Sequence, residues 1–572
     1  MKKKQQLWDK APFQLSWLIL TYFLCVLFFF HIFKMFKINH ALVLTLVISI
    51  SLPALYYSLQ SKEKLKKQTI IVLMLYFLLC IGMPFLFSRT YDLTADGNTY
   101  HKLSIGYLRN GWNPLYQSTE QFEKMNDLPD SGVNHKWMNH YPKATWITSA
   151  VMYEMTGYIE SGKCITTLLI LAMGLLSFSY LSTFLNKKQS FILSVLLALN
   201  PIILAQLFNY YVDGIMGICF FMEVIVLLNI DITKKQDIRL WIYLLAICSI
   251  FINLKFTGLL YSGMIAAVFY FYWLYKNRKE KNFWNDFKRI TIHFTVMFSI
   301  AIFVIGSSSY VRNTIVKHNP LYPLIGKDKV DIITTMQPNS FKKASSIEKF
   351  VISMFSRTEN VTYGGNEPRL KFPIKIYKSE IEQLSVADIR IAGFGPWSAC
   401  FFVLGTALLI VEIYILYRKD KTKLKFVFLP LTCIFLTSIF VGENWWARYV
   451  PQLYLIPWFA ICLMFYLKID NAMKSKILKL FGYILMIIII VNASFYFYQR
   501  GNDLKSFKKI RSDLYELSLQ DKVELQLSDP AMLAFYYNLD DAGIKYHIIN
   551  KELCEKEFRY VYSWRFKVKN NE

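Results

Sequence analysis

The chain has few charged residues for its length. Only 18% of its 572 positions are Asp, Glu, Lys or Arg, whereas soluble globular proteins average about 25%. Hydrophobic residues make up 54% of the sequence and aromatic residues 17%. A soluble globular protein of this size does not carry such a balance, so the composition excludes that class and indicates a polytopic membrane protein.

Cysteine is also scarce, and several common motifs are missing. Eight of the nine cysteines lie in or beside apolar segments, and only Cys554 lies in a polar region. This distribution gives no disulfide framework and no zinc-ligand spacing. The sequence has no P-loop, no Ser-His-Asp order, no nucleotide-binding fingerprint and no internal repeat. Soluble nucleotide-dependent chemistry therefore has no support in the sequence.

Acidic residues are outnumbered, with 40 Asp and Glu against 65 Lys and Arg and a net charge of +25. Such an excess can mark a nucleic-acid-binding protein. Here, however, the basic residues form short clusters between apolar segments instead of one basic face or tail. Membrane topology explains that pattern better, and we expect no nucleic-acid partner.

What the sequence has in abundance is long apolar runs. A hydrocarbon core about 30 Å thick needs roughly 20 apolar helical residues. About thirteen stretches meet or approach this length: residues 13–33, 41–58, 69–88, 164–184, 190–208, 212–230, 239–254, 256–275, 290–310, 394–416, 426–441, 451–467 and 480–498. The first is too long for a signal peptide and lacks a cleavage site, so we interpret it as an uncleaved span.

The basic clusters predict which way the spans run. Short cytoplasmic loops collect Lys and Arg, and with a cytoplasmic N-terminus every basic cluster falls on the inner side. We therefore expect a multi-pass plasma membrane protein whose C-terminal tail lies outside. Two long outer loops follow from this topology, residues 89–163 and 311–393.

The expected fold class is an all-α polytopic membrane protein with a small extracytoplasmic α/β domain at its C-terminus. Residues 1–499 would form the transmembrane body, including both outer loops, and residues 500–572 the tail. Within the first loop, the apolar run at 146–153 is too short to span and predicts a helix lying at the membrane interface. The tail shows helical patterning at 504–519, an alternating strand pattern at 523–527 and a further helix after Pro530.

Three aspartates are placed where predicted spans meet the outer side. Asp92 and Asp96 follow the third span, and Asp213 starts the sixth. A partly desolvated carboxylate at such a place can accept a proton from a hydroxyl or help to bind a metal. Helix capping by each aspartate is the alternative interpretation, because Asp is a common N-cap residue.

Cationic residues also interrupt the apolar pattern on the expected outer side. Lys255 separates two spans, Arg312 follows the ninth, and Arg448 precedes Tyr449 in an aromatic turn bounded by Pro451. Charges at bilayer depth are costly, which favours a functional role such as holding a lipid phosphate. The alternatives are a snorkelling lysine and an aromatic belt with one interfacial arginine.

Three histidines, His101, His140 and His318, lie in the outer loops without metal-ligand spacing. They are expected to form hydrogen bonds and not to act directly in catalysis.

Several of these residues lie in short motifs with an order typical of one family. The motifs are Asp96-Gly-Asn-Thr-Tyr-His101, Tyr141-Pro142, Val212-Asp-Gly214, Lys255-Phe-Thr-Gly258, Asn319-Pro-Leu-Tyr-Pro323 and Ala447-Arg-Tyr-Val-Pro451. Together they cover roughly residues 70–470, and the chain resembles the glycosyltransferase C superfamily. Members include protein O-mannosyltransferases and aminoarabinose lipid A transferases, which use polyprenyl-phosphate-linked sugars.

The resemblance implies a role for the first-loop acid as catalytic base, which points to Asp96. The family places paired acids directly after the first span, whereas here the acids follow the third span and are four residues apart, so the choice between Asp92 and Asp96 stays open. Tyr100 and His101 are assigned to substrate binding with Lys255, Arg312, Arg448 and Tyr449. No cofactor is required, although Asp92, Asp96 and Asp213 could together hold a divalent metal.

The predicted function is transfer of one sugar from a polyprenyl-phosphate donor to a glycan, lipid or protein of the cell envelope. Membrane lipid is the other expected partner. A lipid-linked glycan flippase or transporter is one alternative, although transporters often contain repeated halves. A glycan polymerase or ligase with a large outer loop is another.

Overall fold

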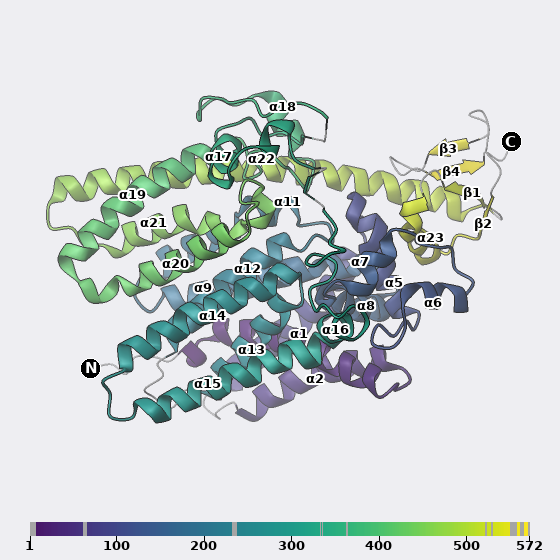
Figure 1. The fold of residues 1–572 in the computed structure, drawn as a ribbon, viewed down its shortest axis with the longest axis horizontal. Coiled ribbons are helices and arrows are strands. Elements are labelled where there is room, and N and C mark those ends of the chain that lie inside the picture. Colours follow the sequence, from purple (N-terminus) through teal and green to yellow (C-terminus); the bar gives the residue numbers. More distant parts are fainter. Residues whose placement is uncertain are drawn as a thin grey trace.

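The structure is a computed structural model that describes residues 7–60, 66–230, 237–331, 333–334, 336–361, 364–520, 523–527, 530–549, 558–560 and 566–569. Helices dominate it. Figure 1 shows the long helices running lengthwise, with the α14–α15 and α19–α20 connections at one end and α5 to α8 at the other.

In the described part of the first half of the chain, the regular elements are all helices. Its helices are α1 (Ala11–Met35), α2 (Ala41–Gln60), α3 (Lys66–Phe77), α4 (Met83–Phe87), α5 (Lys102–Arg109), α6 (Thr119–Met125), α7 (Asn134–His140), α8 (Ala144–Thr156), α9 (Cys164–Leu181), α10 (Lys187–Ala198), α11 (Pro201–Ala205), α12 (Asp213–Asn229), α13 (Ile238–Ile252) and α14 (Phe256–Asn277).

The second half adds the remaining helices and a small sheet. The helices are α15 (Phe283–Ser299), α16 (Arg312–Lys317), α17 (Ser346–Met354), α18 (Lys378–Gln383), α19 (Ser398–Lys419), α20 (Lys425–Phe440), α21 (Leu455–Tyr466), α22 (Ala472–Ser518) and α23 (Tyr536–Asp541). The strands are β1 (Val523–Leu527), β2 (Tyr546–Ile548), β3 (Phe558–Tyr560) and β4 (Phe566–Lys569).

Nine helices in the described part of the chain are long and apolar enough to cross a membrane. They correspond to nine of the thirteen expected spans, so the membrane-protein class is confirmed while the count of thirteen is not. The other four stretches form shorter helices. Residues 190–208 break into α10 and α11 because Pro201, which has no amide hydrogen, begins a new helix capped by Asn200. The other three correspond to α12, α13 and the segment ending in α21.

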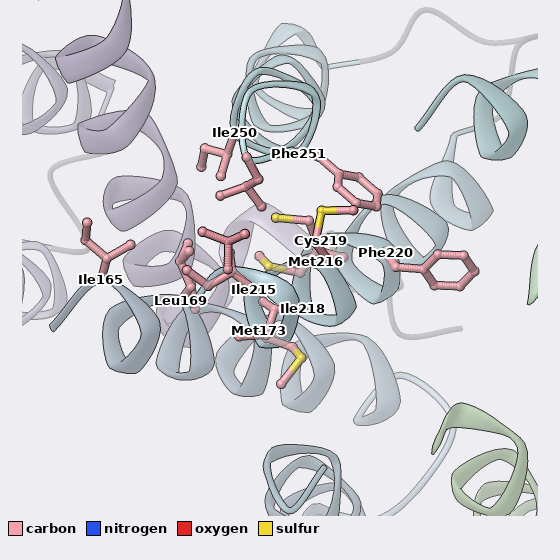
Figure 2. Packing of buried hydrophobic residues seen from close by; sticks show 14 of the residues in the cluster. Ile165, Leu169, Met173, Ile215, Met216, Ile218, Cys219, Phe220, Ile250 and Phe251 are labelled. Atoms are coloured by element: carbon pink, nitrogen blue, oxygen red, sulfur yellow. The ribbon is translucent and has the colours of Figure 1, made fainter. Parts of the chain in front are cut away.

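The core lies where α9, α12 and α13 meet. Figure 2 shows Leu169 and Met173 of α9 beside Ile215 and Ile218 of α12, with Phe251 of α13 close by. All of α12 from Asp213 to Leu227 is buried. A helix that is apolar on every side is enclosed by protein or lipid, and here its neighbours are other helices. This central helix also carries a charged residue, Asp213, at its first position.

The apolar run at 146–153 does not expose a face to the membrane interface. It forms α8, in which every side chain from Ala144 to Tyr153 is buried. Its contacts are with α1, α2 and α5. The prediction of an interfacial helix was wrong because protein, not lipid, covers its apolar surface.

The C-terminal tail is a small α/β unit joined directly to the body. The last long helix, α22, runs unbroken from Ala472 to Ser518, so residue 500 falls inside a helix. Strand β1 covers the expected strand at 523–527, and the sheet order is β2-β1-β4-β3. Helix α23 docks on the first loop, where Asn538 accepts a hydrogen bond from Lys102 Nζ at 2.8 Å.

Candidate functional site

The first-loop aspartates have different surroundings. Asp92 is fully buried. Its Oδ1 accepts hydrogen bonds from the Thr94 amide at 2.8 Å and the Thr94 hydroxyl at 2.6 Å, and its Oδ2 accepts one from the Tyr210 amide at 2.8 Å. Burial raises the pKa of Asp92, and Lys163 opposes that shift. Asp92 therefore joins the first loop to the turn before α12, and its complete burial keeps its oxygens away from a substrate.

Gly97 is required next to Asp92. A Cβ atom on residue 97 would lie only 2.0 Å from Asp92 Oδ2, closer than two non-bonded atoms can approach. The glycine of the Asp96-Gly-Asn motif therefore allows the loop to pack against the buried carboxylate. Asp96 is consequently held at the neighbouring, more open position.

Asp96 is half-buried and lines a cavity of about 460 Å³. Its Oδ2 accepts a long hydrogen bond, 3.4 Å, from the Tyr100 hydroxyl. It begins the short helical segment Gly97–His101 without making a capping hydrogen bond, so the capping interpretation does not explain it. Of Asp92 and Asp96, Asp96 is the one that can reach a ligand in this cavity.

Asp213 and Lys255 form a buried ion pair. Lys255 Nζ lies 3.0 Å from Asp213 Oδ1, and both side chains are less than a tenth exposed. Lys255 therefore does not snorkel to water. Its ammonium lies 4.3 Å from the centre of the Tyr449 ring, a cation–π contact. Asp213 accepts a further hydrogen bond from Gln206 Nε2 at 3.2 Å and makes no capping bond to the backbone of α12.

Arg448 joins Asp213 to a carboxylate of the second loop. Its Nε lies 3.3 Å from Asp213 Oδ2, and its Nη1 lies 3.0 Å from Asp388 Oδ1. Burial raises the pKa of Asp388, and Arg448 opposes that shift. We call Asp213, Lys255, Asp388 and Arg448 the charge cluster. Its two acids and two bases balance, which allows four charged groups to lie together in a low-dielectric environment.

Local packing brings the Arg448 turn onto α12. A Cβ atom on Gly217 would lie 3.0 Å from Pro451 Cβ, so glycine there lets the turn approach the helix. Asn200 Nδ2 donates a hydrogen bond to the Pro451 carbonyl at 3.0 Å. These contacts place Arg448 directly over Asp213 at the start of α12.

Helix α22 fixes the loop that carries Asp388. The Arg500 guanidinium donates hydrogen bonds to the Ala205 carbonyl at 2.7 Å and the Leu384 carbonyl at 3.3 Å. Tyr496 donates one to the Gly393 carbonyl at 3.0 Å. The second loop is therefore held against the membrane body on both sides of Asp388.

The cavity beside the charge cluster has polar walls. Arg448 and Tyr211 line both this cavity and a narrow pocket of about 20 Å³ that reaches Lys255 and Asp213. Three buried polar atoms of the larger cavity's walls, Arg390 Nε, Trp446 Nε1 and Asn360 Oδ1, have neither a hydrogen-bond partner nor an ion-pair partner among the described residues. Such groups are costly to bury unless a ligand or water satisfies them. The cavity size matches small-molecule sites, which are about 300–1,000 Å³.

Tyr100, His101 and Tyr449 also come to this region. Tyr100 and His101 line the narrow pocket, and Tyr449 lines the larger cavity. His101 Nδ1 accepts a hydrogen bond from Trp146 Nε1 at 2.7 Å.

Arg312 lies elsewhere. It lines neither of these two cavities, and among the described residues its guanidinium hydrogen bonds only to the Asn139 carbonyl, at 3.5 Å. Its neighbour Asn313 accepts a 2.7 Å hydrogen bond at Oδ1 from His140 Nδ1 and donates one from Nδ2 to the His140 carbonyl at 3.0 Å. The segment at 312–313 therefore holds α7 in place, and the structure does not support Arg312 as part of the charge cluster.

The sequence patterns missed part of the site. Asp388, Arg390 and Asn360 come from the second outer loop, whose sequence carries no motif or spacing that marks them. Trp446 was seen only as part of an aromatic turn. The available signal was weak: Asp388 and Arg390 are charges within a short apolar stretch, Val386-Ala-Asp-Ile-Arg-Ile391.

The three aspartates do not gather as a metal site in the described part of the chain. Asp92 is held by Thr94 and Tyr210, and Asp213 by Lys255 and Arg448. Cations of the protein itself already neutralise Asp213. The geometry therefore does not support a metal ion bound jointly by these three aspartates.

His101 predicts a pH dependence of stability. Burial lowers its pKa to about 3, against the opposing pull of Asp213. Below about pH 6.5, His101 binds a proton in the unfolded protein but stays neutral in the folded protein. The free energy of unfolding therefore falls as the pH drops from 6.5 towards 3. Between pH 7 and 5 this loss is about 2 kcal/mol. In thermal melts of purified protein, His101→Gln should show a smaller drop over this range than wild type; equal drops would contradict the prediction.

The fold and the site thus define a polytopic membrane protein with a buried charge cluster that opens onto a polar cavity. Comparison with protein-family models gives no match. A search of curated proteins likewise finds no matching sequence.

Proposed function

We propose that this protein is a membrane glycosyltransferase of the glycosyltransferase C type, which moves a sugar from a polyprenyl-phosphate donor onto a cell-envelope acceptor. The observation that carries the proposal is the placement of Asp96 and Arg448 in the walls of one cavity, with Lys255 paired to the same Asp213 as Arg448. An acid and cations in a desolvated cavity beside apolar helices suit a substrate with a sugar, a phosphate and a lipid tail.

The cations are suited to the donor phosphate. When the bond between sugar and phosphate breaks, negative charge grows on the phosphate oxygens. Arg448 offers a planar fork of donors, and its charge is held in place by Asp213 and Asp388. Preorganised charges of this kind are often worth several kcal/mol in a transition state. The unpaired Arg390 Nε and Trp446 Nε1 offer further donors to phosphate or sugar oxygens.

Asp96 is suited to act as the base. In a single displacement, the acceptor hydroxyl oxygen bonds to the anomeric carbon while the carbon–oxygen bond to phosphate breaks. The hydroxyl proton passes to Asp96, and the bonding electron pair leaves with the lipid phosphate. This step inverts the anomeric configuration and balances without a metal.

The proposed orientation follows from the distribution of basic residues. With the N-terminus in the cytoplasm of a plasma membrane protein, the charge cluster and the tail would face outward. An outer site suits an acceptor that is an envelope glycan, lipid or protein.

Transfer is tested by incubating purified full-length protein with a polyprenyl-phosphate sugar labelled in the sugar, together with envelope acceptor fractions. We expect the label to move to an acceptor and the free carrier phosphate to appear in equal amount. A flippase would move the intact donor across proteoliposome membranes without releasing carrier phosphate. A polymerase or ligase would act on a preassembled glycan instead. Donor left intact under all conditions would overturn the proposal.

Lys255→Ala should weaken use of the donor. The Lys255 ammonium is paired with Asp213, and Asp213 in turn orients Arg448. Loss of the ammonium should therefore raise KM for the donor by about tenfold, equivalent to about 1.4 kcal/mol. Lys136→Ala, which removes an exposed lysine of α7, is the control. An unchanged donor KM in Lys255→Ala would leave the lysine with a structural role alone.

A further inference from the structure

A second cluster of ionisable side chains lies in the first outer loop, around His135. His135 Nε2 is 2.8 Å from Asp130 Oδ1 and 3.2 Å from Glu123 Oε2. One ligand atom from each of the three residues lies within 4.8 Å of the others. Glu123 belongs to α6, His135 to α7, and Asp130 to the connection between them. The cluster therefore joins three consecutive parts of the loop.

Surrounding groups hold two of these side chains in position. The Tyr107 hydroxyl donates a 2.7 Å hydrogen bond to Glu123 Oε1. Glu123 Oε2 accepts a 3.3 Å hydrogen bond from the Ser131 amide and lies 3.2 Å from His135 Nε2. Thr119 Oγ1 lies 2.7 Å from His135 Nδ1, on the ring edge opposite Asp130. A hydrogen bond to the far ring nitrogen is how proteins orient a metal-binding histidine.

Two of the three side chains of this cluster are mostly buried, and the third is exposed to solvent. The Glu123 side chain is 5% exposed and that of His135 12%, whereas that of Asp130 is 82% exposed. A cavity of about 460 Å³ lies over them, lined also by Glu120, Lys124, Leu128 and Gly132. A solvated ion can therefore enter and keep water in a remaining coordination position.

We propose that Glu123, Asp130 and His135 bind one divalent transition-metal cation of the zinc class. A tetrahedral zinc with bonds of about 2.0–2.1 Å places its ligands roughly 3.3 Å apart, close to the separations of His135 Nε2 from the two carboxylate oxygens. An imidazole ligand favours zinc and its neighbours in the transition series, whereas magnesium and calcium prefer oxygen alone. Three protein ligands and one water complete a tetrahedron.

The bound ion would stabilise the first loop. It would join α6 to α7, and α7 continues to His140, which is hydrogen bonded to Asn313 of the second loop. The competing explanation is that His135 only makes hydrogen bonds to the two carboxylates. The two explanations differ in that only a metal site responds to added metal.

Metal binding is tested with purified full-length protein stripped by a chelator and titrated calorimetrically with zinc chloride. We expect one zinc per chain in wild type and a rise in melting temperature with zinc, because binding to the folded state stabilises it. Asp130→Asn and His135→Gln should each weaken zinc binding about tenfold or more. Asp127→Asn, which removes an exposed carboxylate of the same connection, should bind like wild type.

Three results would overturn the proposal: no zinc bound by wild type, equal affinity in Asp130→Asn and Asp127→Asn, or calcium binding as tightly as zinc. Asp130 is mostly exposed, so Asp130→Asn is expected to fold even if His135→Gln does not. All readouts are independent of sugar transfer.

Discussion

Replacing Asp96 with asparagine is expected to lower the rate of sugar transfer about 10²- to 10⁴-fold, the usual contribution of a general base. Asparagine keeps the size of the side chain and can still accept a hydrogen bond from Tyr100, but it cannot take the acceptor proton. Because Asp96 is half-buried and holds only a 3.4 Å hydrogen bond to Tyr100, the change should leave folding intact. The measurement is kcat with labelled donor.

The matched variant is Asp92→Asn, which decides between the two candidate bases. Asp92 is buried, and each of its oxygens accepts a hydrogen bond from a backbone amide, that of Thr94 or that of Tyr210. In Asp92→Asn, the side-chain NH₂ group would face one of these N–H donors, and that hydrogen bond would be lost. We expect Asp92→Asn to lower melting temperature and yield, with kcat per folded molecule near wild type. Asp127→Asn controls for loss of a loop carboxylate. Wild-type turnover by Asp96→Asn would remove Asp96 from the role of base.

Replacing Arg448 with methionine is expected to cost both stability and activity. The change leaves Asp388, whose side chain is 18% exposed, without the cation with which it pairs, and leaves the buried Asp213 with Lys255 alone. Breaking a buried ion pair by removing one partner typically costs about 3–5 kcal/mol. Melting temperature and urea resistance measure the first effect, and transfer from the labelled donor measures the second.

Two companion variants separate the effects. Arg448→Met combined with Asp388→Asn removes both members of one pair and should recover part of the stability but not the transfer. Arg448→Lys keeps the charge but loses the planar fork, so its stability and rate should lie between those of wild type and Arg448→Met. Wild-type stability in Arg448→Met would show that the charge cluster does not hold the fold together. Wild-type transfer would remove Arg448 from phosphate binding.

The sequence located the membrane helices well where they are long. Nine expected spans appear as long apolar helices, because the composition of each stretch is a local property. The shorter helices were harder to count: residues 190–208 read as one apolar run, yet the Asn200-Pro201 pair divides it. The interfacial placement of α8 was wrong because the length of an apolar run does not show whether lipid or protein covers it.

The candidate site was predicted in part. Asp213, Lys255 and Arg448 were singled out separately as unusual charges at the ends of apolar runs, and the structure brings all three together. Arg312 had the same sequence features but lies beside α7. The fourth member of the charge cluster, Asp388, was missed because loop sequence has no periodicity from which to read burial.

The sequence by itself determined the class of this protein, since apolar length and the spacing of basic residues are enough to specify helices that belong in a bilayer. The tertiary structure decided which charges belong together. Asp388 meets Arg448 and Arg448 meets Asp213 only because α12, the Arg448 turn and the loop held by α22 pack against one another. A buried charge is tolerated where packing supplies its partner, and that partner is far away in the sequence.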